Sequence, residues 1–205
     1  MLPKPQLTKV FKMIKYRFYG TDSAGRPIRI SKAPKMDIKD IFEKLSLQEW
    51  LDIQIMTLER TQNIILPACS RKHGHVVDQF VSIIDMSNFE LGSVLDSKFV
   101  EANKKSVKAF EQNYPLIIHK TYFINVPTVF YIVWKVFSVF LSDKTKSRIE
   151  IYSKDDFSKL KDDFDLDHLP TEIGGNCGIP INDYTNFWDD EMKESYARKS
   201  LFPKK

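Results

Sequence analysis

The chain has 205 residues, of which 42% are hydrophobic and 28% are charged. These proportions are typical of one globular domain with a full core, and they exclude a disordered or fibrous chain. With only two cysteines, Cys69 and Cys177, the sequence supports no disulfide framework, so we expect a reducing compartment. Fifteen Phe and eight Tyr make it rich in aromatic residues, which suit either a dense core or an apolar cavity.

Basic residues gather at the N-terminal end of the chain. Residues 1–35 carry a net charge of +8, and the remainder carries −4. Such a segment either meets phosphates on lipid or nucleic acid, or forms a solvated leader. Residues 1–15 contain no apolar run long enough for a secretory signal, and we treat them as a basic N-terminal segment.

The first elements that the sequence predicts are a β-hairpin and two helices. Strands at 16–20 and 28–30 flank the segment TDSAGRP, whose Asp, Ser, Gly and Pro residues favour a turn. A short helix over 37–45 precedes a longer one that runs to about residue 65. Ser46 is the expected N-cap of the longer helix, and Glu49 completes a capping box.

The middle of the chain alternates between predicted strands and helices. A loop over 66–75 leads into a strand over 76–86, and an apolar stripe predicts a helix over 94–114. The next strand covers 119–126. This alternation favours a mixed or parallel sheet with helices packed on it, in one domain over 16–176.

Residues 122–141 have nearly the composition of a membrane span, with Lys135 as their single charge. Pro127 divides this run, because proline removes a helix donor and favours extended geometry in its predecessor. What remains is a strand and a helix of about 14 residues, too short to cross a bilayer. We expect a buried strand followed by a very apolar helix over 128–141.

The predicted elements after this helix are shorter. A last strand over 148–153 is followed by an acidic helical segment over 154–168. LPTEIGG, residues 169–175, forms a glycine turn. The segment 177–205 is a polar tail with a short helix over 189–199.

Motifs of catalytic sites are absent from the sequence. It contains no GxGxxG, GxxxxGK[ST], GxSxG or HExxH, so we expect no enzyme and no cofactor. Cys69, His73 and His75 form the best candidate for a metal site. Their spacing fits no closed four-ligand centre, and the alternative is a polar loop, so we predict no bound metal.

Four segments together carry a resemblance to the CRAL-TRIO family over residues 16–176. FYGTDSAGRPIRI resembles the entry hairpin of these domains, and LPTEIGG is similar to their closing motif. LPACSRKHGHVVDQFVSIIDM closely resembles a stretch of the fungal phosphatidylinositol/phosphatidylcholine transfer proteins, with PACSR, a Gly-His and a strand that ends in Asp. The run from NYPLIIHK through INVPTVF to the apolar helix is similar to the family's central segment.

The resemblance implies an α/β CRAL-TRIO fold, in which a mixed, mostly parallel sheet forms the floor of a hydrophobic pocket under a mobile gate helix. The gate corresponds to residues 128–141, although a buried core helix is the alternative from composition alone. The implied ligand is a phospholipid or another hydrophobic small molecule, carried between membranes. Candidate ligand-binding residues are Phe80, Ser82, Ile84, Tyr122, Ile124, Phe130, Val133, Phe137, Phe140 and Glu172.

Three of these candidates can be compared with family positions. Ser82 lies where small hydroxyl residues contact the choline headgroup in the fungal transfer proteins, whereas Phe80 stands where another hydroxyl is expected. Glu172 stands where inositol-binding members have a lysine that meets the phosphate. A carboxylate there repels a phosphate, so we expect poor binding of phosphatidylinositol.

The resemblance also implies a cytoplasmic monomer that contacts membranes transiently and binds no nucleic acid. Its function is then lipid binding and transfer. The alternative is a lipid-free or lipid-sensing regulatory or scaffold module with the same fold.

Overall fold

The structure, a computed structural model, describes residues 16–33, 42–43, 45–89, 91–153, 156 and 160–178. Its centre is a sheet of five strands whose spatial order equals their order in the chain. The first pair is antiparallel and the other pairs are parallel. The strands are β1 (Tyr16–Thr21), β2 (Pro27–Lys32), β3 (Phe80–Asp85), β4 (Ile118–Val126) and β5 (Ile149–Ser153).

The predicted hairpin is present as β1 and β2. The Asp22 carboxylate accepts hydrogen bonds from the backbone N–H groups of Ala24 and Arg26 at 2.9 and 2.8 Å. Gly25 has a φ of +76°, which a residue with a side chain rarely adopts. The Asp and Gly residues of the turn therefore act as expected.

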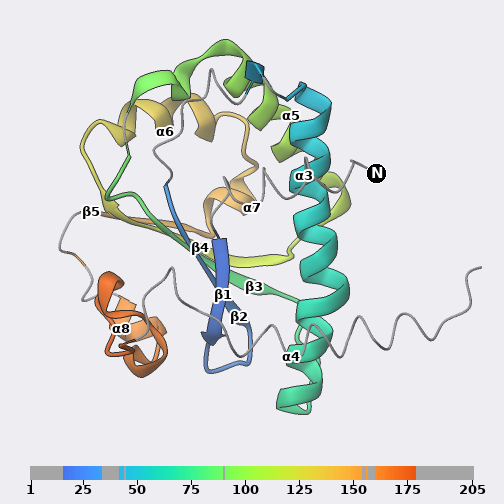
Figure 1. Cartoon of the computed structure of the whole chain (residues 1–205), viewed down its shortest axis with the longest axis vertical. Helices are drawn as coiled ribbons and strands as arrows, with labels where there is room; N and C mark the ends of the chain where they lie inside the picture. Colours follow the sequence, from blue (N-terminus) through green and yellow to red (C-terminus); the bar gives the residue numbers. More distant parts are fainter. Residues whose placement is uncertain are drawn as a thin grey trace, which may run out of the picture.

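Helices that connect the parallel strands lie on one face of the sheet (Figure 1). Crossovers between parallel strands are right-handed, and a strand order without reversal directs them all to the same face. They are α3 (Leu47–Arg60), η1 (Thr61–Ile65), α4 (Leu66–His73), η2 (Gly92–Leu95), α5 (Ser97–Asn113), α6 (Phe130–Ser138) and α7 (Asp143–Lys146). Three short elements cover the other face: α8 (Leu160–Asp163), η4 (Leu166–His168) and η5 (Thr171–Ile173).

The start of α3 confirms the predicted capping box. The Ser46 side chain accepts from the Glu49 N–H, and the Glu49 carboxylate accepts from the Ser46 N–H. The predicted loop over 66–75 is wrong, because the helix continues through α4 to His73. A π-helical turn, η1, precedes Pro67, and there the Leu66 N–H donates to Thr61 five residues back. This widened turn accommodates a proline that would break a regular helix.

The apolar run over 122–141 divides at Pro127, as predicted. Strand β4 ends at Val126, and α6 begins three residues after the proline. None of the helices in the described part of the chain combines the length and apolarity needed to cross a bilayer.

Some predicted elements lie outside the described residues. These are the basic segment 1–15, the helix over 189–199 and most of the helix over 37–45, of which only residues 42, 43 and 45 are described. Within 154–168, the described part forms α8 and η4.

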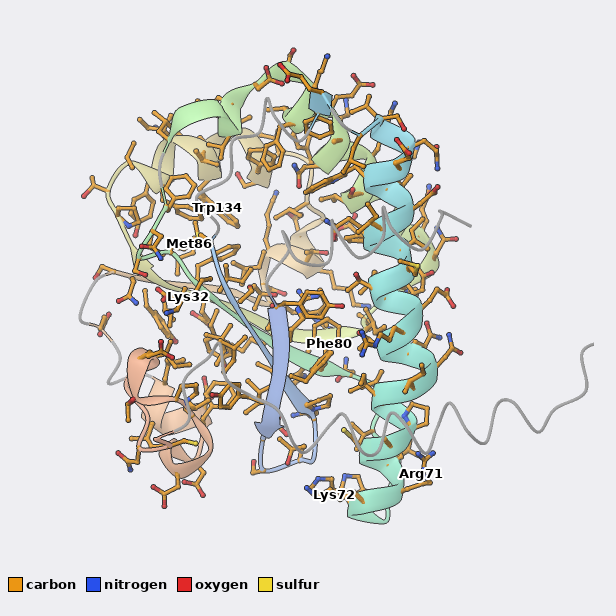
Figure 2. The ribbon with its side chains drawn as sticks, viewed as in Figure 1. Lys32, Arg71, Lys72, Phe80, Met86 and Trp134 are labelled. Atoms are coloured by element: carbon orange, nitrogen blue, oxygen red, sulfur yellow. The ribbon has the colours of Figure 1, made fainter. Side chains whose placement is uncertain are left out.

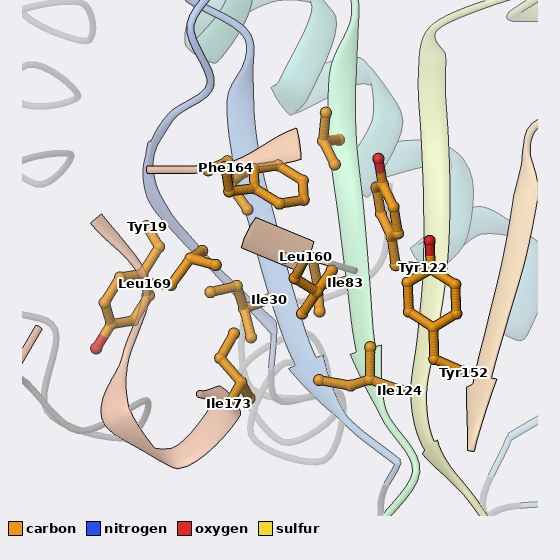
Figure 3. Packing of buried hydrophobic residues seen from close by; sticks show 12 residues of the cluster. Tyr19, Ile30, Ile83, Tyr122, Ile124, Tyr152, Leu160, Phe164, Leu169 and Ile173 are labelled. Atoms are coloured by element: carbon orange, nitrogen blue, oxygen red, sulfur yellow. The ribbon is translucent and has the colours of Figure 1, made fainter. Parts of the chain in front are cut away.

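The face of the sheet under η4 and η5 is closely packed (Figure 3). Ile30, Ile83 and Ile124 project from adjacent strands onto Leu169 and Ile173, and all are essentially inaccessible to solvent. Gly175 closes this layer, because a Cβ built there would lie 2.0 Å from the Leu169 carbonyl oxygen. The backbone fits here only without a side chain.

Replacing Gly175 with Ala is therefore expected to destabilise the protein by about 1–3 kcal/mol, as overpacking does in closed cores. Gly178→Ala is the matched control, because nothing lies within 4 Å of a Cβ at that position. Thermal unfolding measures both variants. Equal melting temperatures for the two would contradict the close contact at Gly175.

Candidate functional site

A cavity of about 880 Å³ lies between the sheet and the crossover helices. This volume is near the upper end of the range of about 300–1,000 Å³ that is usual for small-molecule sites. Strands β2 to β5 form its floor, α5 forms a wall and α6 covers it. In Figure 2, Trp134 on α6 and Met86 after β3 lie on this side of the sheet, and both line the cavity.

Helix α6 presents different residues to the cavity and to solvent. Three of the candidate residues, Phe130, Val133 and Phe137, line the cavity, and their three- and four-residue spacing places them on one face of the helix. On the opposite side, Ile132 is 52% exposed, and Val139 just beyond the helix is 71% exposed. The helix is therefore apolar on the face toward the cavity and on the face toward solvent.

Phe140 does not line the cavity, contrary to our expectation. The helix ends at Ser138, so Phe140 no longer follows the helical spacing that places Phe137 inward. It packs edge-on against Phe137 with 6.3 Å between ring centroids, and the Lys104 ammonium lies 5.6 Å from its ring.

Of the candidates on the sheet, only Ile84 lines the cavity. Tyr122 and Ile124 point to the opposite face and belong to the packed layer beneath the sheet. The cause is the strand register. Ser82 pairs with Thr121, so odd-numbered residues of β4 share the face of even-numbered residues of β3. Thr121 and Phe123 take the cavity positions we had assigned to Tyr122 and Ile124.

Glu172 also lies away from the cavity. It is in η5, on the other face of the sheet, and its carboxylate is 3.1 Å from the Lys32 ammonium. Phe80 and Ser82 are fully buried and do not line the cavity, but both contact Arg29, which does.

Arg29 is a cavity residue that we did not predict. The guanidinium of Arg29 is deeply buried, but the residue as a whole is only partly buried. Its accessible surface faces the cavity. Burial lowers the pKa of Arg29 from its ordinary value. The sequence contained a signal for this position. Arg29 lies between Ile28 and Ile30 in a strand, so its side chain must project to the face opposite to theirs.

Glu111 fixes the chain segment that follows α6. Its carboxylate accepts from the Ser142 N–H at 3.0 Å and from the Thr145 hydroxyl at 2.5 Å. Partial burial raises the pKa of Glu111, but these hydrogen bonds outweigh it, so the pKa is lowered. This contact joins α5 to the start of α7, at the far end of the cavity cover.

Tyr114 links the end of α5 to α3. Its hydroxyl donates a short hydrogen bond to the Glu59 carboxylate. Loss of solvation, the hydrogen bond and the negative charge raise the pKa of Tyr114 to about 12. Since the folded pKa lies above the ordinary value of 10.0, the protonated tyrosine stabilises the fold. That contribution is complete below about pH 10 and is lost as the pH rises through about 12.

Tyr114→Phe is thus expected to lower stability at about pH 8 and to reduce the loss of stability between about pH 10 and 12. Urea unfolding at several pH values measures both effects. Tyr131→Phe, which removes an exposed hydroxyl, serves as the control. An unchanged alkaline profile for Tyr114→Phe would contradict a stabilising contact with Glu59.

The candidate metal ligands have other roles in the structure. Cys69 is buried in α4, and the His75 ring lies 3.0 Å from the Ala24 carbonyl oxygen. His73 packs against Gly25 of the hairpin turn. Within the described ranges, no three His, Cys, Asp or Glu side chains are grouped as a metal site requires.

Comparison with known proteins identifies related sequences. The sequence profile of the CRAL/TRIO domain matches residues 11–175. A phosphatidylinositol/phosphatidylcholine transfer protein, SFH4 of Arabidopsis thaliana, is 26% identical over 177 residues, covering 84% of this chain and 28% of the relative. The SEC14 cytosolic factor of Yarrowia lipolytica is 28% identical over 173 residues, covering 84% of this chain and 35% of the relative.

A third relative and a solved structure agree with these matches. The Sec14 cytosolic factor of Schizosaccharomyces pombe is 26% identical over 163 residues, covering 80% of this chain and 56% of the relative. This chain therefore spans from just over a quarter to just over half of the length of these relatives. The crystal structure of Sfh5 is similar in fold, with a TM-score of 0.65 and 16% identity, over 98% of this chain and 67% of the Sfh5 chain.

Proposed function

This chain belongs to the CRAL/TRIO domain family, and from that premise we propose that it binds one lipid molecule in the cavity and transfers it between membranes. The observation that carries the proposal is the cavity of about 880 Å³ with a mostly apolar lining. Apolar walls accept acyl chains because burial removes hydrocarbon from water. Ile84, Phe130, Val133 and Phe137 are the predicted ligand contacts that the cavity geometry supports.

The alternative, a lipid-free scaffold with the same fold, fits the cavity poorly. Protein interiors are packed like organic crystals and contain few voids larger than a water molecule. A module with only a structural role gains nothing from a large apolar cavity, since its lining loses dispersion contacts. The cavity therefore favours a ligand-binding function.

Helix α6 supports exchange at a membrane surface. Its outer face carries Tyr131 and Ile132, and Val139 follows directly after it; all three are large, apolar and exposed. Such a patch fits insertion at the boundary between headgroups and acyl chains. The function is then that of a non-catalytic monomer in the cytosol that contacts membranes transiently, in line with the printed names of relatives called cytosolic factors.

Filling the cavity is expected to reduce lipid binding. Val133→Trp places a large side chain against the cavity, where it competes for volume with the acyl chains. The matched control is Val76→Trp, at a valine that is 82% exposed outside the cavity. Purified protein is incubated with phosphatidylcholine vesicles and separated, and the bound lipid per chain is measured by mass spectrometry.

The wild type and Val76→Trp should retain about one lipid per chain, and Val133→Trp should retain much less. A wild-type protein that retains no lipid would contradict lipid binding and support the scaffold. Equal lipid content in the two variants would place the ligand elsewhere.

Removing the apolar contact on the outer face of α6 is expected to slow transfer without unfolding the protein. Ile132→Glu loses a side chain whose burial in a bilayer is worth about 1.5–3 kcal/mol, which corresponds to a transfer rate lower by about tenfold or more. Val76→Glu is the control, with the same kind of change at a distant exposed position.

Transfer of fluorescent lipid between two vesicle populations measures the rate, and circular dichroism checks the fold. Transfer by Ile132→Glu at the rate of Val76→Glu would contradict membrane contact through α6.

A further inference from the structure

A row of polar residues crosses the strands under the cavity between two apolar rows; Arg29 and Thr121 in this row line the cavity, and Ser82 between them is fully buried. Arg29 on β2 pairs in register with Ser82 on β3, which pairs with Thr121 on β4. On one side of this row Ile84 lies beside Phe123, and on the other side Phe80 lies beside Ile118. Residues that share a row project to the same face, so a guanidinium and two hydroxyls gather between apolar side chains of β3 and β4. Arg148, before β5, also lines the cavity, but its guanidinium donates to the Ile118 carbonyl oxygen at 2.9 Å.

Three side chains contact Arg29 at the end of this row. Its Nη2 donates to the Ser82 hydroxyl oxygen at 3.1 Å. The guanidinium carbon lies 4.8 Å from the centre of the Phe80 ring and 5.6 Å from that of Tyr16. Aromatic faces stabilise a cation, but they leave directional N–H groups without a good acceptor. The Arg29 Nε is indeed buried without a hydrogen-bond partner.

The positive charge of Arg29 has no counter-charge in the described part of the protein. The carboxylates there that form ion pairs do so with other cations, such as Asp22 with Arg26 and Glu172 with Lys32. A buried charge is retained in a folded protein when something pairs with it. Since Arg29 lines the cavity and none of the described carboxylates pairs with it, an anion that enters the cavity can supply its counter-charge.

We propose that Arg29, supported by Ser82 and Thr121, binds an anionic group on the lipid in the cavity, either a carboxylate or a phosphate monoester. This inference rests on the proposed lipid binding and specifies the class of lipid. The anion supplies both the missing counter-charge and an acceptor for the Nε–H, in the paired geometry that guanidinium groups favour. A choline group placed at this point would face a like charge, so the site disfavours it.

The test loads the 205-residue chain from phosphatidylcholine vesicles that carry one labelled probe. The probes are oleate, dioleoyl phosphatidate and the neutral lipid dioleoylglycerol. Arg29→Met is expected to lower the ratio of loaded anionic probe to loaded dioleoylglycerol by about tenfold or more, as loss of a charged hydrogen bond does. The probe that responds distinguishes a carboxylate from a phosphate monoester. Lys32→Met is the control, since it removes a cation of the same strand that faces away from the cavity.

A second variant keeps the test valid if Arg29→Met does not fold. Ser82→Asp places a carboxylate beside the guanidinium, so the protein supplies its own counter-charge. This variant should keep or raise the melting temperature and should lose anionic loading by a similar factor. An unchanged ratio of anionic to neutral loading in both variants would overturn the anion site while lipid binding stands. A wild type that loads none of the lipids would overturn lipid binding, and the anion site with it.

Discussion

Right-handed crossovers on a sheet without strand reversal place every connecting helix on one face, and the rest of the molecule depends on this constraint. The opposite face must then be covered by residues that come after the last strand. Short elements with a glycine at their closest approach do this, and the layer that they form is dense. The helical face is different, because helices fixed at both ends by strands span the sheet and leave space beneath them.

The pleat of each strand then divides its residues between these two environments. In β2, Ile28 and Ile30 enter the dense layer, and Arg29 between them enters the cavity. Lys32 has the parity of the isoleucines and emerges at the far face, where Glu172 neutralises it. One short strand therefore supplies a surface ion pair and a cavity cation. The difference between the two cations follows from alternation and not from their local sequence.

Features that depend on neighbouring residues could be predicted from the sequence. The capping box at Ser46, the hairpin turn and the division at Pro127 are signals of this kind, and each is present in the structure. The cavity face of α6 was also predictable, because helical spacing placed Phe130, Val133 and Phe137 together. The family resemblance supplied the fold and the position of the cover.

Features that depend on how distant segments meet could not be predicted. The pairing of β3 with β4 shifts by one residue between Phe80 and Val81. After this shift, even-numbered residues of β3 lie beside odd-numbered residues of β4 and share their face. The continuation of the helix past Pro67 depends on a single π-helical turn, which apolar periodicity does not reveal. The hydrogen bond between Arg29 and Ser82 depends on the pairing of β2 with β3, which the sequence around either residue does not reveal.

The same sheet order sets the sequence of events in folding. The hydrogen bond between Arg29 and Ser82 joins residues 53 positions apart, because a complete helical crossover separates β2 from β3. Closing such a loop costs chain entropy before any strand contact compensates for it, and parallel pairing is slow for this reason. The hairpin and the individual helices can form early from local contacts. We therefore expect the floor to form late, and during synthesis its first parallel pair must wait until β3 has left the ribosome, since β3 begins at Phe80 and the hairpin ends at Lys32.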